Sequence, residues 1–120
     1  MSNMQLIASI IQGEAGEMGP IGMMAVALSI SCRMWQHDHS VERIAREYYG
    51  RAEPDACAKL LAQLVLDDVL PDNDYYFVMG HECDVQEQDM KRGEWVVMNQ
   101  EDTMGLHLYS IDNVPWEVTD

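Results

Sequence analysis

The stretch IIQGEAGEMGPIGMMAVALSISCR, residues 10–33, decides the fold. Glycines recur in it at every third position, at Gly13, Gly16, Gly19 and Gly22. With Pro20, they predict a loop between residues 13 and 20. Pro20 also suits the first turn of a following helix, which we expect to run to about residue 35. This helix is apolar on nearly all sides, and such a helix is usually the central, buried one.

Helical patterns continue on both sides of this stretch. Ser2 or Asn3 is suited to cap a first helix that runs to about Gln12, with an apolar stripe along one face. A short third helix is predicted over residues 40–50. A fourth begins at Pro54 and Asp55 and ends before residue 71. The first sixty-odd residues are therefore expected to be helical.

The residue composition changes after the Asp-rich turn at residues 72–74. Segments 75–79, 95–98 and 106–111 are short and rich in β-branched or aromatic residues, which is typical of strands. The last two are expected to form a hairpin through residues 99–103, and the polar segment 80–93 is expected to be a long loop. Helices first and strands later predict an α+β fold, and 120 residues predict one domain over 1–120.

Charge is the unusual feature of the composition. Twenty-one Asp and Glu face seven Lys and Arg, for a net charge of −14. This balance argues against nucleic acid or an anionic membrane as a partner, because clustered Lys and Arg hold phosphates. Most of the excess lies in residues 67–120. That half is either a solvated face that keeps the protein soluble or a docking surface for a basic protein partner.

Cysteine and histidine usage gives little indication of a metal or a disulfide framework. The three cysteines are an odd number at wide spacing, which favours a reducing compartment and buried thiols. His81 and Cys83 are two residues apart, but no second ligand pair has the spacing of a zinc site, so we expect no metal and no cofactor.

The most apolar run, residues 23–32, is too short to cross a bilayer and follows Glu14 and Glu17 rather than a basic segment. The expectation is therefore a chain that is cytoplasmic as synthesised and has no membrane partner.

Glu14 is the strongest catalytic candidate on local grounds. It stands at the end of an apolar helix, just before the predicted loop and the most buried helix. We expect a carboxyl group there to be partly desolvated, and desolvation is the effect that prepares a carboxyl group for general-acid chemistry near neutral pH. The alternative is a helix-end glutamate that simply meets solvent.

Several short motifs resemble the SleB-like, spore-cortex-lytic family of cell-wall hydrolases. The opening Gly13-Glu14-Ala15, with Gly22, Ala25-Val26-Ala27 and Arg33 after it, is similar to that family's first motif. The Asp72–Phe77 segment resembles its middle Asp-rich turn and strand. The stretch Gly105-Leu106-His107-Leu108-Tyr109 is similar to its closing strand. The motifs occur in the family's order from about residue 5 to 110.

The resemblance implies a lysozyme-like domain that cleaves peptidoglycan between N-acetylmuramic acid and N-acetylglucosamine. Glu14 would donate a proton to the glycosidic oxygen and then take one from the muramic 6-hydroxyl, as in a lytic transglycosylase, or from water, as in a hydrolase. The partner would be a glycan strand. A phage-type enzyme of this kind is released to the wall by a separate pore or carried in the virion.

Substrate-binding candidates follow from the same motifs. Tyr76, His107 and Tyr109 come from them, and the tyrosines offer rings that stack on sugars. Glu17, which stands where the family usually has Gly, is added as a binding candidate and candidate second carboxylate. His107 and Tyr109 would share one face of a strand. Gly16, Met23 and Cys32 depart from the family pattern. These departures motivate the alternative of a catalytically decayed module that binds a glycan or another small molecule.

Overall fold

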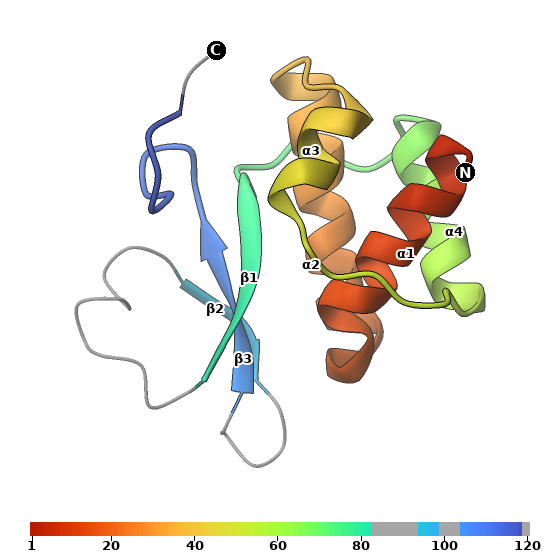
Figure 1. Ribbon diagram of the computed structural model, residues 1–120. Helices are drawn as coiled ribbons and strands as arrows, with labels where there is room; N and C mark the ends of the chain where they lie inside the picture. Colours follow the sequence, from red (N-terminus) through yellow and green to blue (C-terminus); the bar gives the residue numbers. More distant parts are fainter. Residues whose placement is uncertain (83–93, 99–103, 119–120) are drawn as a thin grey trace.

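The computed structural model describes residues 1–82, 94–98 and 104–118. Four α-helices come first, and they gather on one side of the molecule, while a small sheet forms the other side (Figure 1). The helices are α1 (Asn3–Ala15), α2 (Gly19–Ser31), α3 (Val41–Glu47) and α4 (Ala56–Leu66). The strands are β1 (Phe77–Glu82), β2 (Glu94–Met98) and β3 (Met104–Tyr109). The predicted α+β class, with helices before a small antiparallel sheet, is confirmed.

Side-chain caps fix where three of the helices begin. Ser2 and Gln5 form a reciprocal capping box at the start of α1. The Ser40 hydroxyl accepts from the Arg43 N–H at the start of α3, and Asp55 accepts from the Ala58 N–H at the start of α4. These side chains satisfy N–H groups that the first turn of a helix leaves without backbone partners.

The loop predicted between residues 13 and 20 is wrong. α1 continues to Ala15, a single 3₁₀ turn covers Gly16–Met18, and α2 begins at Gly19. Gly16 keeps a helical backbone, with φ of −57°, and Gly19, at φ of +77°, is the glycine that turns the chain. The chain therefore reverses with one left-handed residue, which glycine adopts without steric cost.

A second irregular segment follows α2. Residues Cys32–Gln36 form a short π-helical turn, and this turn carries Arg33 into the interior, where it has no exposed surface. Single π turns of this kind often occur at functional sites.

The sheet is antiparallel, with the order β1-β3-β2. Its register pairs Phe77 with Tyr109 and Met79 with His107, so these four side chains share one face. β1 begins two residues later than expected and extends to Glu82, and β3 ends at Tyr109. The predicted loop over 80–93, beyond Glu82, and the hairpin connection 99–103 lie outside the described residues. So does part of the acidic half of the chain.

One hydrophobic core joins the two layers. It contains Ile7, Ile10 and Ile11 of α1, Val26 and Ile30 of α2, and Val78 and Leu106 of the sheet. The helical run Asn3–Gln36 is long and apolar enough to cross a bilayer by length and composition. Because Gly19 breaks it into two helices that pack against each other and form this core, the run carries no argument for a membrane span.

Candidate functional site

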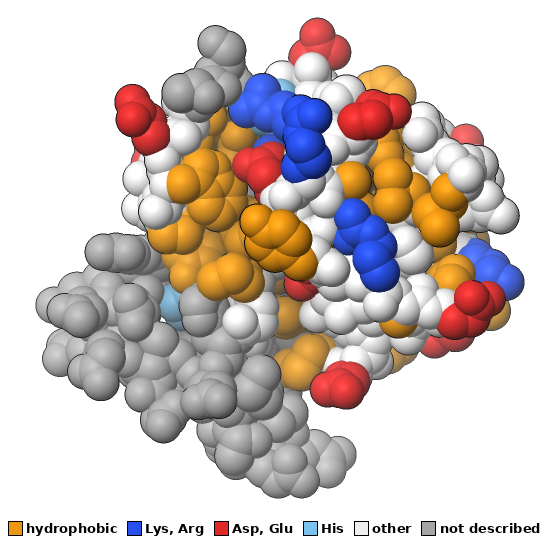
Figure 2. All heavy atoms as spheres, in the orientation of Figure 1, with side chains coloured by type: hydrophobic (Ala, Val, Ile, Leu, Met, Phe, Trp, Pro, Cys, Tyr) orange, Lys and Arg blue, Asp and Glu red, His pale blue; other side chains and the backbone are white. Residues whose placement is uncertain are grey.

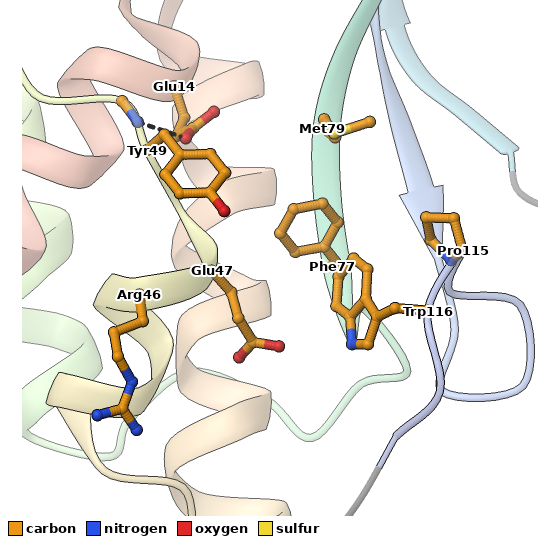
Figure 3. A pocket seen from close by; sticks show the side chains of 9 residues that line it. Glu14, Arg46, Glu47, Tyr49, Phe77, Met79, Pro115 and Trp116 are labelled. Carbon is orange, nitrogen blue, oxygen red and sulfur yellow. Dashed lines mark hydrogen bonds between the residues drawn. The ribbon is translucent and has the colours of Figure 1, made fainter.

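A cavity of about 560 Å³ opens between the helical layer and the sheet. It lies within the usual size range of small-molecule sites. Its lining is mostly aromatic and apolar, with charged groups at one side: Glu14, Arg46, Glu47, Tyr49, Gly50, Phe77, Met79, Pro115 and Trp116. Figure 3 shows the two sides, with Glu14, Glu47 and Tyr49 from the helical layer facing Phe77 and Trp116. The cavity therefore combines carboxylates with aromatic surfaces.

Glu14 stands at the C-terminal end of α1, half-buried, where this cavity meets a second one. Its Oε1 accepts a hydrogen bond from the Gly50 N–H at 2.7 Å (Figure 3). Within the described part of the chain this is its one hydrogen bond, so Oε2 is the oxygen left to meet a ligand. The carboxyl group is thus held in a fixed orientation with one oxygen open, which suits proton transfer to a bound molecule.

The segment over residues 50–55, which contains the Gly50 N–H that binds Glu14, is hydrogen-bonded to α1. The Ala52 N–H donates to the Ser9 carbonyl at 3.2 Å, and the Asp55 N–H donates to Gln12 Oε1 at 3.0 Å. The Arg51 guanidinium donates to the carbonyls of Ala45, Tyr48 and Gly50. These bonds fix the turn after α3 and therefore the position of the Gly50 N–H.

Two glycines make this close approach feasible. A Cβ added at Gly13 would lie 2.3 Å from the Arg51 backbone nitrogen, and one added at Gly50 would lie 2.8 Å from the Glu14 nitrogen. Real Cβ atoms do not come so close to backbone atoms. The glycine that precedes Glu14 therefore has a packing role, since it lets the 50–52 segment lie directly against the end of α1.

The buried Arg33 does not line the cavity, but it contacts a residue that does. Its guanidinium forms an ion pair with Glu47 and lies 4.2 Å from the centre of the Tyr76 ring. Its Nε donates to His39 Nδ1 at 2.8 Å. The sequence shows Arg33 only as part of a motif. The structure shows that it binds the Glu47 carboxylate in the wall of the cavity.

The second cavity, of about 470 Å³, lies on the other side of Glu14. Glu17, one of the predicted binding residues, is exposed and lines it together with Gln12 and Arg51. Gly80 and Leu106 of the sheet form its far wall. Glu14 therefore belongs to both cavities, and Glu17 to the second one alone.

The other three predicted binding residues lie under the surface. Tyr76 is 1% exposed, contacts Arg33 and the rings of His37 and His39, and lines neither cavity. His107 and Tyr109 are buried too, and His107 Nδ1 lies 3.4 Å from the Tyr109 hydroxyl. Both share the sheet face of the cavity-lining Phe77 and Met79. They support the cavity floor and do not form its open surface.

Sequence reasoning missed Glu47, Tyr49 and Trp116. Tyr49 is 88% exposed although it lies next to the buried Tyr48, and Trp116 follows the last strand and packs edge-on against Phe77 with ring centres 4.8 Å apart. Nothing in the sequence distinguishes Tyr49 from its buried neighbour Tyr48, because exposure is a property of the fold. Trp116 could not be placed from the sequence, because only the fold brings it to α3.

Other chemistry finds little support among the described residues. Burial raises the pKa of the Cys32 thiol from 9.0 to about 11, which leaves it protonated and a poor nucleophile. Among the side chains that the structure describes, those of residues 1–80 and 105–118, no group of three His, Cys, Asp or Glu could hold a metal ion. His81 and Cys83 lie outside these ranges.

Comparison with known proteins adds no assignment. No family model, no curated protein and no solved structure matches the chain.

Proposed function

We propose that this protein is a peptidoglycan-cleaving glycosidase with Glu14 as its general acid and base, on a lysozyme-like fold. The observation that carries the proposal is the position of Glu14: a half-buried carboxyl group at a helix end, oriented by the Gly50 N–H, in the wall of a cavity lined by aromatic side chains. The motifs that resemble cell-wall hydrolases contain this same residue.

The cavity suits a sugar chain. Tyr49, Phe77 and Trp116 present ring surfaces, and aromatic rings bind the apolar faces of sugars while their polar edges remain wet. The cavities on the two sides of Glu14 would hold the sugars on either side of the bond to be broken. A chain threaded past Glu14 would bring a glycosidic oxygen to its open Oε2.

The reaction needs one proton donor that later accepts a proton. Glu14 gives its proton to the glycosidic oxygen, the C1–O bond breaks, and its electron pair stays with the leaving oxygen. The muramic 6-hydroxyl or a water molecule then attacks C1 and returns a proton to the Glu14 carboxylate. The first acceptor gives a 1,6-anhydro product and the second a reducing end.

Digestion of purified sacculi tests the proposal. The wild-type protein is expected to release soluble muropeptides, and Glu14→Gln, which keeps the shape but cannot donate a proton, is expected to release none. Glu42→Gln is the matched control, because Glu42 is exposed on α3 and lines neither cavity. Its activity should stay within a few-fold of wild type.

Three outcomes would overturn the proposal or part of it. Failure of the wild-type protein to release muropeptides from sacculi of several wall types contradicts the activity. Release that survives in Glu14→Gln contradicts the role of Glu14. Binding of glycan fragments with no turnover, insensitive to Glu14→Gln, selects the alternative of a decayed binding module.

A further inference from the structure

A second carboxylate lines the same cavity as Glu14. Glu47 is the last residue of α3, its side chain is 24% exposed, and it belongs to the lining together with Phe77 and Trp116. Figure 3 shows its carboxyl group directed from α3 toward the Trp116 side of the cavity. The Gly50 N–H that orients Glu14 follows Glu47 by three residues, so one short segment fixes both groups.

The charge of Glu47 is set by a buried cation. Arg33 has no exposed surface, and a guanidinium group stays protonated in proteins. A buried charge without a counter-charge is strongly destabilising, and the carboxylate that pairs with Arg33 is Glu47. Glu47 is therefore the counter-charge of Arg33, and its carboxylate is held in one orientation.

The two members of the pair differ in their distance from solvent. Arg33 is fully buried, whereas Glu47 keeps part of its side chain exposed at the cavity. The carboxylate thus stands between the guanidinium and the cavity, so a ligand there meets the negative charge first. Figure 2 shows Lys and Arg side chains gathered over α3 beside the hydrophobic side chains on the sheet side, so this part of the surface is not uniformly acidic.

We propose that Glu47 is the second functional carboxylate of the site and stabilises the positive charge that develops on the sugar ring during cleavage. This inference rests on the proposed function. When Glu14 protonates the leaving oxygen and the C1–O bond breaks, C1 and the ring oxygen become electron-deficient. A fixed negative charge nearby lowers the energy of that state more than that of the neutral substrate.

The ion pair also separates the roles of the two carboxyl groups. Glu47 Oε2 accepts from the Arg33 guanidinium, so this oxygen is already engaged by a cation. Glu14 carries no such counter-ion among the described residues and keeps the proton-transfer role. Arg33 is then a positioning residue, which acts on the reaction through Glu47.

Kinetics of Glu47→Gln on a soluble peptidoglycan fragment test the inference. The expected result is a fall in kcat on the order of 10²-fold with little change in KM, because the charge acts on the transition state and not on binding. Glu42→Gln is the matched control, since Glu42 is exposed on the same helix and undergoes the same change of charge. Its kinetics should equal those of wild type.

A double variant separates this role from a purely structural one. Glu47→Gln leaves Arg33 without its counter-charge and is expected to lower stability on that account alone, whereas Arg33→Met with Glu47→Gln removes both charges together. If the double variant folds, with a thermal midpoint near that of wild type, and still shows the loss in kcat, the inference holds.

Recovery of wild-type kcat in the double variant, or no loss in Glu47→Gln, overturns it even if Glu14→Gln is inactive. If the wild-type protein cleaves no glycan, the proposed function fails and this inference falls with it.

Discussion

At the scale of single residues, the contact between Glu14 and Gly50 depends on two backbone segments that lie too close together for a side chain to fit between them. The Gly50 N–H reaches Glu14 Oε1 at 2.7 Å only because neither Gly13 nor Gly50 has a side chain at the crossing of α1 and the 50–52 segment. The motif glycine before the proposed catalytic residue is therefore explained by packing, whatever the reaction.

Gly13→Ala and Gly16→Ala test this explanation as a pair. The new Cβ at residue 13 would meet Arg51 backbone at 2.3 Å, whereas at residue 16 it meets the end of the flexible Gln12 side chain. We expect Gly13→Ala to lower the free energy of unfolding by about 1–3 kcal/mol, as overpacking does, and Gly16→Ala to be tolerated because its φ of −57° is helical. Urea unfolding measures both, and equal effects would contradict the packing role.

At the scale of elements, Tyr48 connects α3, α2 and β1. The Val78 N–H donates to the Tyr48 hydroxyl at 2.8 Å. The Tyr48 hydroxyl lies 2.7 Å from Ser29 Oγ and donates to it, because Ser29 uses its own proton in the next bond. Ser29 in turn donates to the Tyr76 carbonyl at 3.2 Å. Burial raises the pKa of the Tyr48 phenol well above its ordinary value, which keeps it a donor. This chain of bonds sets the distance between the helical layer and the sheet, and hence the width of the cavity.

Tyr48→Phe is expected to cost about 1–3 kcal/mol of folding free energy, because it leaves the buried Val78 N–H and the Ser29 hydroxyl without their partner. Tyr49→Phe removes the same hydroxyl from the neighbouring residue, which is 88% exposed, and should be neutral. Thermal unfolding of both variants checks this. A neutral Tyr48→Phe would show that the network does not hold the two layers together.

The elements themselves were largely readable from the sequence. Ser40 and Asp55 marked helix starts because a cap is a local interaction. The reversal after α1 was misread, since glycine permits a loop but does not require one, and of the four glycines at 13, 16, 19 and 22 only Gly19 takes a left-handed backbone. β1 begins later than predicted because the N–H groups of Tyr75 and Tyr76 still donate within the preceding turn, to Asn73 Oδ1 and the Asp74 carbonyl.

At the scale of the whole molecule, only part of the candidate site could be predicted from the sequence. Glu14 could be singled out from its local sequence and its resemblance to a known motif. Glu47 and Trp116 could not, because the cavity forms where α3 meets the segment after β3, and neither the pairing of Arg33 nor the path of that segment is a local property. The opposite error concerns Tyr76, His107 and Tyr109, which were predicted to bind substrate and are buried. A strand pattern does not distinguish a buried tyrosine from one that lines a cleft.

The net charge of −14 makes a prediction for the molecule as a whole. An acidic protein and an anionic wall polymer repel each other, and salt screens this repulsion, with a Debye length that falls from about 30 Å at 0.01 M to about 8 Å at 0.15 M. The initial rate of muropeptide release should therefore rise several-fold over this range. Uncharged chitin oligomers are the control substrate and should show no such rise. A rate on sacculi that falls with salt would instead indicate attraction to the wall.

The most direct measurement of the central claim is a crystal structure of Glu14→Gln with a peptidoglycan tetrasaccharide. We predict a glycan chain that passes between Tyr49 and Trp116, with a glycosidic oxygen within hydrogen-bond distance of the residue 14 side chain. A glycan bound elsewhere on the molecule, or cavities on both sides of residue 14 that stay free of sugar at saturating concentration, would contradict the account.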